Sequence, residues 1–311
     1  MTADTAENNS VPPPRPRQWF LSSTAILALI LLAGALLRGI YLFEIAAEPT
    51  FDYTVYDPQY NDYWARGLAT GHWVLPPDVN DPRILTTPHG RPPGYPYFLA
   101  AVYKIFGLSY FVPRLVQMAL GLINALLLYL LGKRLFGNTA GLIAAAFGAT
   151  YWAFLYYEGI LTYPSVVMFL LLALMLVLEK WLREPDAGLA FGAGLLFGLF
   201  GLFRPNGLLF GPVLVAWMFW ILCGRGIRFR NFLLTAACLT VGTIAVIAPT
   251  ALRNYRVAHD FVFISSYGGL NFYAGNHEGA CLTEPRIPEL RKLAGMDNWS
   301  CFDYPAIVRG L

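Results

Sequence analysis

The sequence predicts an all-α protein that crosses a membrane several times, and its composition is the first reason. Apolar residue types make up 57% of the 311 residues, whereas Asp, Glu, Lys and Arg together make up only 13%. A typical soluble domain carries about 25% charged residues, so this composition disfavours both a cytosolic enzyme and a disordered chain. The net charge of only +3 gives no strongly basic surface, and nucleic acid is therefore not an expected partner.

The second reason is that the charges leave seven long apolar runs uninterrupted. A helix of about 17–25 residues crosses the ~30 Å hydrocarbon core of a bilayer, and each run is long enough. The first run follows a polar, proline-rich tail but continues to Ala47 without a small-residue cleavage site, so we expect a retained span rather than a signal peptide. The predicted spans are residues 20–37, 115–132, 135–157, 159–178, 187–203, 205–224 and 231–252.

The short connections between the runs predict the orientation. If the runs alternate, four basic clusters fall on one side, which the positive-inside rule makes cytoplasmic. These clusters are Arg15/Arg17, Lys133/Arg134, Lys180/Arg183 and Arg225/Arg228/Arg230. We therefore expect a multi-pass protein of the inner (plasma) membrane with a cytoplasmic tail (1–19), a transmembrane unit (20–252) whose first extracytoplasmic loop covers about 45–114, and an extracytoplasmic segment (253–311).

Two short helices are predicted in this first loop. Asp57-Pro58 is typical of a helix start and Gly71 of a helix end, and Tyr60, Trp64 and Leu68 form an apolar stripe between them. A second helix over residues 95–106 would be only ~18 Å long, so it should lie in the membrane interface or re-enter the membrane.

The carboxylates of the loop allow two interpretations. Asp57 is either a simple helix cap or a carboxylate held at the membrane surface to accept a proton. Asp52 and Asp62 compete for the second role. Asp62 lies roughly 140° around the helix from Asp57, so these two side chains cannot both face one site.

Further charged candidates stand at the outer ends of the apolar runs. Glu158 lies between two runs, where an acid is either a functional residue, paired with Arg91, Arg204 or an acceptor hydroxyl, or an ordinary solvated corner. A guanidinium suits phosphate recognition, which makes Arg91, Arg204 and Arg253 candidates. Simpler explanations are contact of Arg204 with lipid headgroups and an ion pair between Arg91 and Asp81.

No cofactor is required by the sequence. CxxC, HExxH, GxGxxG and Walker patterns are absent from it, and its four histidines are scattered, so neither a zinc site nor a nucleotide site is predicted. A Mg²⁺ or Mn²⁺ ion bridging Asp57 and Glu158 would suit their oxygen ligands. Cys281 and Cys301 fall in the outer segment, where oxidising conditions would allow a disulfide.

Short segments spread from residue 20 to about residue 280 carry a family resemblance through their order and spacing. They are Asp57 with Tyr60, Tyr63 and Ala65, Gly71-His72-Trp73, residues 91–99 and 103–107, Tyr157-Glu158-Gly159, Arg204-Pro205-Asn206, Pro249 with Arg253-Asn254-Tyr255, and residues 268–276. Together they resemble the C-type (GT-C) polyprenyl-phosphate-sugar glycosyltransferases. The similarity is closest to bacterial members of the dolichyl-phosphate-mannose–protein mannosyltransferase family, which includes relatives that add aminoarabinose to lipid A.

The resemblance implies a membrane enzyme that moves a sugar from a polyprenyl phosphate to a lipid, glycan or protein acceptor outside the cytoplasm, with membrane lipids around it. A single displacement would invert the anomeric centre. In such a family the first-loop aspartate is the expected base, which Asp57 matches, and Glu158 ranks second as a substrate or metal contact. The expected substrate-binding residues are Arg91, Arg204, Arg253, Tyr95 and His89.

The resemblance also leaves alternatives open. Family members generally run longer, so a chain ending at Leu311 is either a fragment or a short member. A lipid or solute transporter, or a flippase, would also place charges at span ends, although repeated halves with broken helices are not found in this sequence. A non-catalytic assembly subunit is the third possibility.

Overall fold

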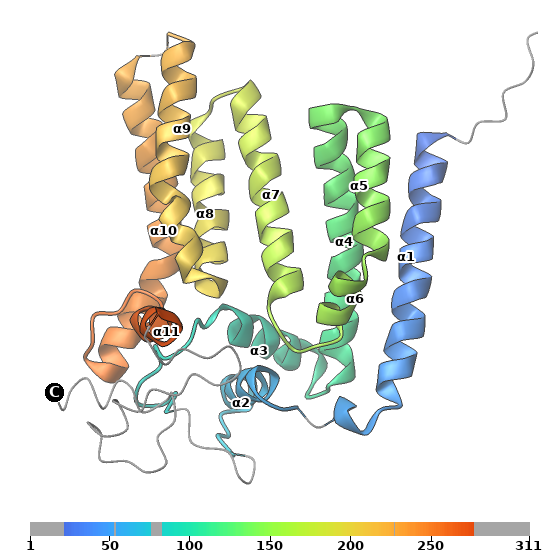
Figure 1. Ribbon diagram of the computed structural model, residues 1–311. Coiled ribbons are helices and arrows are strands. Elements are labelled where there is room, and N and C mark those ends of the chain that lie inside the picture. Colours follow the sequence, from blue (N-terminus) through green and yellow to red (C-terminus); the bar gives the residue numbers. More distant parts are fainter. Residues whose placement is uncertain (1–21, 53, 76–82, 227, 277–311) are drawn as a thin grey trace, which may run out of the picture.

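The computed structural model describes residues 22–52, 54–75, 83–226 and 228–276, and no β-strand occurs in these ranges. Long helices stand side by side, while α2, α3 and α11 lie across one end of the bundle (Figure 1). The elements are α1 (Ser23–Ala46), η1 (Pro49–Phe51), α2 (Asp57–Thr70), α3 (Gly94–Phe106), α4 (Phe111–Phe136), α5 (Asn138–Thr150), α6 (Trp152–Glu158), α7 (Pro164–Arg183), α8 (Ala187–Phe203), η2 (Pro205–Phe210), α9 (Gly211–Gly224), α10 (Phe229–Ala258) and α11 (Tyr267–Asn276). The predicted cytoplasmic tail and the Cys281–Cys301 pair lie outside the described residues.

Each of the seven predicted apolar runs is mostly helical over its described residues, but the helices differ in length, and the fourth run begins with a non-helical stretch at residues 159–163. Five helices are long and apolar enough to cross a membrane, namely α1, α4, α7, the continuous η2–α9 segment and α10. The third run forms α5 and α6, which meet at 49° and give a sixth span only if they are taken together. The fifth run, α8, has 17 residues. The protein is therefore a multi-pass helical membrane protein, with five or six spans by length and one shorter apolar helix.

The two predicted first-loop helices are confirmed. α2 ends at Gly71 and α3 ends at Gly107, and both glycines have a left-handed φ, +78° and +84°, that other residues adopt only with strain. Both helices lie at the same end of the bundle as α11 (Figure 1). The loop is thus an ordered layer across the bundle end.

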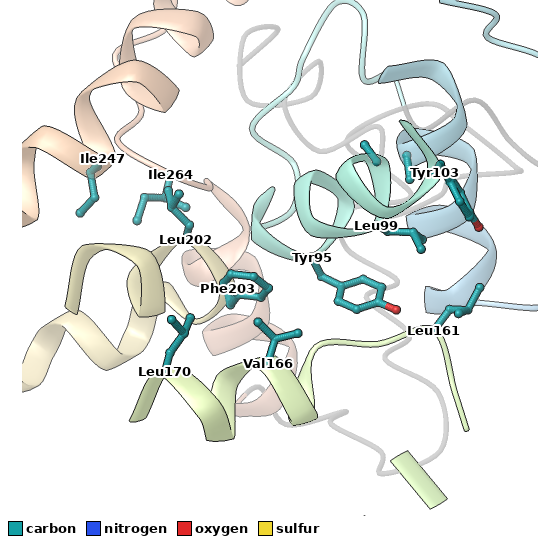
Figure 2. Packing of buried hydrophobic residues seen from close by; sticks show 12 residues of the cluster. Tyr95, Leu99, Tyr103, Leu161, Val166, Leu170, Leu202, Phe203, Ile247 and Ile264 are labelled. Carbon is teal, nitrogen blue, oxygen red and sulfur yellow. The ribbon is translucent and has the colours of Figure 1, made fainter. Parts of the chain in front are cut away.

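An apolar cluster attaches this layer to the bundle. Tyr95 and Leu99 of α3 belong to a buried group that includes side chains from α7, α8 and α10, and Phe203 at the end of α8 lies beside them (Figure 2). Gly94 allows the close approach, because a Cβ at that position would lie 2.6 Å from the Phe203 ring. The start of α3 and the end of α8 are consequently held together.

Close helix packing elsewhere in the bundle depends on glycine. α8 and α10 approach so closely that a Cβ on Gly194 would lie 2.1 Å from the backbone oxygen of Leu239, and Gly198 and Gly242 stand at similar contacts. Small residues at such a seam let two backbones pack without side chains between them, as in many membrane bundles.

We predict that Gly194→Ala destabilises the protein by forcing α8 and α10 apart. The expected result is a clear fall in the thermal unfolding midpoint of the purified protein in detergent, because the clashing atom is backbone and cannot rotate away. Gly192→Ala on the same helix is the matched control, since a Cβ there meets nothing within 4 Å. Equal midpoints for both variants would contradict the packing described above.

Candidate functional site

The candidate base lies at the start of α2 and is paired with an arginine. Asp57 is the first residue of the helix, and its side chain is 62% exposed. Its carboxylate accepts a hydrogen bond and forms an ion pair with Arg91, which precedes α3. The Arg91 guanidinium also lies 4.6 Å from the centre of the Tyr60 ring. Arg91, from the segment between α2 and α3, therefore orients the Asp57 carboxylate at the start of α2.

The interpretation of Asp57 as a helix cap is wrong. Tyr56 is the N-cap residue, and no side-chain hydrogen bond caps the helix. Tyr56 has φ +56° and ψ −127°, a conformation that costs a residue with a side chain about 1–3 kcal/mol. Such strain gathers at functional sites, where it is retained because it places a neighbouring group. The alternative pairing of Arg91 with Asp81 concerns a residue outside the described ranges.

Asp62, the competing carboxylate, is occupied by neighbours. It is buried and accepts hydrogen bonds from the hydroxyls of Tyr103 (2.5 Å) and Tyr110 (2.9 Å). Arg66, one turn further along α2, donates to both of its oxygens. Burial, reinforced by the Asp62 carboxylate, raises the pKa of both tyrosines, so their hydroxyls remain donors. Asp62 thus fixes α2 against α3 and the start of α4, and it is not open to a substrate.

Glu158 is an internal residue whose partner differs from those expected. It is 2% exposed, and its two oxygens accept hydrogen bonds from Arg38 at 2.7 and 2.8 Å. Arg38 also donates to the backbone oxygen of Ala149 at 2.8 Å. The expected pairing with Arg91 or Arg204 is therefore wrong, as is the solvated corner. The sequence did carry a signal for Arg38. It is a single arginine between the apolar run 20–37 and its apolar continuation, and a charge in such a place requires a partner.

Arg204 and Glu158 nevertheless meet at one cavity. Arg204 follows the end of α8, and its guanidinium lies 4.6 Å from the centre of the Tyr163 ring. The cavity between α4, α6 and α7 has a volume of about 410 Å³, and its lining includes Glu158, Tyr163 and Arg204. Arg204 is thus part of a formed pocket, in addition to any contact with lipid headgroups.

Arg253, near the end of α10, lies against α2. Its guanidinium is 5.7 Å from the ring of Trp64, a fully buried side chain of that helix. The Nη1 atom of Arg253 and the Nε1 atom of Trp64 are both buried, and neither has a hydrogen-bond partner within the described part of the chain. A buried guanidinium nitrogen and a neighbouring indole donor, both without a hydrogen-bond acceptor, favour an anion at this place.

His89 and Tyr95 are buried and have protein partners, and their contact with a substrate stays a prediction. Both are 2% exposed. The ring nitrogens of His89 lie 3.0 Å from the Ser266 hydroxyl and 3.1 Å from the Asp260 carboxylate. The Tyr95 hydroxyl donates to the side-chain oxygen of Gln117 at 2.6 Å. In this structure the two residues link α3 and its preceding loop to the chain after α10 and to α4.

The two candidate catalytic carboxylates have separate guanidinium partners, Arg91 for Asp57 and Arg38 for Glu158. Within the described ranges, no three side chains of His, Cys, Asp or Glu gather in a manner that suits a metal ion. A divalent ion shared by Asp57 and Glu158 stays a prediction.

We predict that Arg38→Ala destabilises the protein by about 3–5 kcal/mol, because Glu158 would be left buried without its partner. Thermal unfolding in detergent measures the effect. The double variant Arg38→Met with Glu158→Leu should recover much of the loss, since two well-packed apolar residues can replace a buried pair. A single variant as stable as the wild type would show that the ion pair does not support the bundle.

The fold is similar to that of two solved structures of an oligosaccharyltransferase from Archaeoglobus fulgidus. The crystal structure of the apo form has a TM-score of 0.54 at 20% sequence identity, over 83% of this chain and 32% of that chain. The AglB oligosaccharyltransferase in complex with an inhibitory peptide and a dolichol-phosphate has a TM-score of 0.54 at 18% identity, over 93% of this chain and 37% of that chain. This chain spans well under half the length of either protein, and the similarity is one of fold.

No curated protein matches the sequence significantly. The sequence profile of the dolichyl-phosphate-mannose-protein mannosyltransferases matches residues 90–252, which are 163 of the 311 residues and thus more than half of the chain. The matched region begins after Asp57, runs from the loop that carries Arg91 through most of α10, and includes Arg204. The chain belongs to the dolichyl-phosphate-mannose-protein mannosyltransferase family.

Proposed function

We propose that this protein transfers a sugar from a polyprenyl-phosphate donor to a lipid, glycan or protein acceptor on the extracytoplasmic side of the membrane. The observation that carries the proposal is the Asp57–Arg91 pair, an exposed carboxylate oriented by a guanidinium at the end of the bundle that α2 and α3 cover. Family membership supports the donor class, and so does the similarity of fold to a protein solved with a dolichol-phosphate.

The chemistry requires one base and several cations. A phosphate group leaves without much help from an acid, so the main needs are removal of the acceptor proton and stabilisation of the phosphate charge. Asp57 takes the proton from the acceptor hydroxyl, whose oxygen then attacks the anomeric carbon opposite the departing phosphate and inverts that centre. Arg204 and Arg253 bind the phosphate.

The charges at the helix ends support an extracytoplasmic site. The last turn of α4 carries Lys133 and Arg134, and the last turn of α7 carries Lys180 and Arg183. These ends lie opposite the end covered by α2 and α3 (Figure 1). By the positive-inside rule, the basic ends face the cytoplasm and the first loop faces outward.

We predict that Asp57→Asn lowers the rate of sugar transfer by about 10²–10⁴-fold while binding of the donor is retained, because the amide cannot accept the acceptor proton. Transfer from a radiolabelled polyprenyl-phosphate sugar by protein in lipid nanodiscs is the assay. Asp52→Asn, at an exposed residue that precedes α2, is the control and should behave as the wild type. Equal turnover by Asp57→Asn and the wild type would rule out Asp57 as the base.

We predict that Arg204→Gln weakens binding of unsubstituted polyprenyl phosphate by about 10- to 100-fold, the usual effect of losing a hydrogen bond between charged groups. Arg256→Gln removes an exposed arginine near the end of α10 and should leave the affinity nearly unchanged. Equilibrium binding in nanodiscs distinguishes the two variants, and the same modest loss in both would reduce Arg204 to a general lipid contact.

A further inference from the structure

The cavity between α4, α6 and α7 is large enough for a small molecule. Its volume of about 410 Å³ falls within the range of about 300–1,000 Å³ that is usual for ligand sites, and a water molecule occupies only about 30 Å³ in the liquid. Two lining residues, Tyr157 on α6 and Leu171 on α7, are 45% and 39% exposed, so the cavity reaches the outer surface of the helices.

Two polar atoms in the wall of this cavity are unsatisfied. The Oδ1 atom of Asn124 and the Oγ atom of Ser165 are buried, and neither has a hydrogen-bond partner within the described part of the chain. Both residues are 6% exposed. The Asn124 amide nitrogen donates to the backbone oxygen of Ser165 at 2.9 Å, which fixes the orientation of the amide and leaves its oxygen as an acceptor. Buried polar atoms in native proteins are normally satisfied, so a bound group should fill this role.

The lining distinguishes between possible ligands. Asn124 presents an acceptor, and the oxygens of Glu158, although paired with Arg38, add further acceptor lone pairs, so hydroxyl groups would donate to this end of the cavity. Arg204 supplies a positive charge to the same cavity from its position over Tyr163. The complementary ligand therefore carries hydroxyl groups at one end and a negative charge at the other.

We propose that this cavity binds the sugar of the lipid-linked donor, with sugar hydroxyls bonded to Asn124 and Ser165 and the donor phosphate at Arg204. This assignment rests on the proposed function and adds to it the residues that recognise the sugar. Helix α2 of the first loop contacts the segment that leads into the cavity wall, because the side chain of Asn61 donates to the backbone oxygen of Leu161 at 3.0 Å, two residues before Tyr163.

The test is Ser165→Ala. This change removes one of the two unsatisfied atoms and breaks no hydrogen bond between the Ser165 side chain and the described protein. The probes are short-chain polyprenyl phosphates carrying mannose, glucose or arabinose, and the same lipid without a sugar, each titrated into the full chain in nanodiscs. For the sugar-bearing lipid that binds the wild type best, we expect the variant to bind about fivefold more weakly. The lipid without a sugar should bind both proteins equally, and the thermal unfolding midpoint should not fall.

Thr162→Val is the matched control. The Thr162 hydroxyl is also buried without a partner in the described structure, but Thr162 is not among the residues that line the cavity, so neither lipid should bind differently. Unchanged binding by Ser165→Ala would mean that water alone fills the cavity, and equal weakening of both lipids would place the phosphate or the prenyl chain there. Either result overturns the inference even if the wild type transfers sugar. A wild type that neither binds nor transfers any of these sugars would instead refute the proposed function.

Discussion

A hydrocarbon environment offers no water to a buried polar group, and this constraint organises the structure. Glu158 is tolerated inside the bundle because Arg38, 120 residues earlier in the chain, meets both of its oxygens. The same constraint makes Asn124 and Ser165 informative, since their unsatisfied atoms line a cavity instead of pairing with each other's side chains. Paired charges thus support the bundle, and the unsatisfied polar atoms are the basis for the proposed ligand site.

The first loop depends on a second set of contacts. The buried Asp62 carboxylate on α2 accepts a hydrogen bond from Tyr103 on α3 and so holds the two helices together. The apolar cluster around Tyr95 packs α3 against α7, α8 and α10. With both helices fixed, Asp57 and Arg91 stand at a defined place relative to the ends of the spans. The positions of Asp57 and Arg91, the two proposed site residues, therefore depend on buried contacts elsewhere in the loop.

Much of the fold follows from local patterns, and much of the site does not. Apolar runs, the Asp57-Pro58 start and the Gly71 end predicted helices, because such signals lie within a few residues of each other. The break at Tyr151 between α5 and α6 has no proline beside it, and Gly148 lies inside α5, so only the extended backbone of Tyr151 reveals the break. Residue type suggested a ligand role for His89 and Tyr95, but burial and partners are set by segments far away in the sequence. The need of Arg38 for a partner could be read from the sequence, but its pairing with Glu158 could not, because the two residues are 120 positions apart.

The links of His89 to Ser266 and Asp260 have a mechanical consequence. His89 and Arg91 are separated by a single residue, Gly90, and the backbone oxygen of His89 also accepts a hydrogen bond from the Ser266 amide at 2.9 Å. The segment that follows α10 thus holds the loop at His89, two positions before the arginine that pairs with Asp57. Displacement of the segment after α10 would therefore be transmitted through Gly90 to Arg91 and would shift the Asp57 carboxylate.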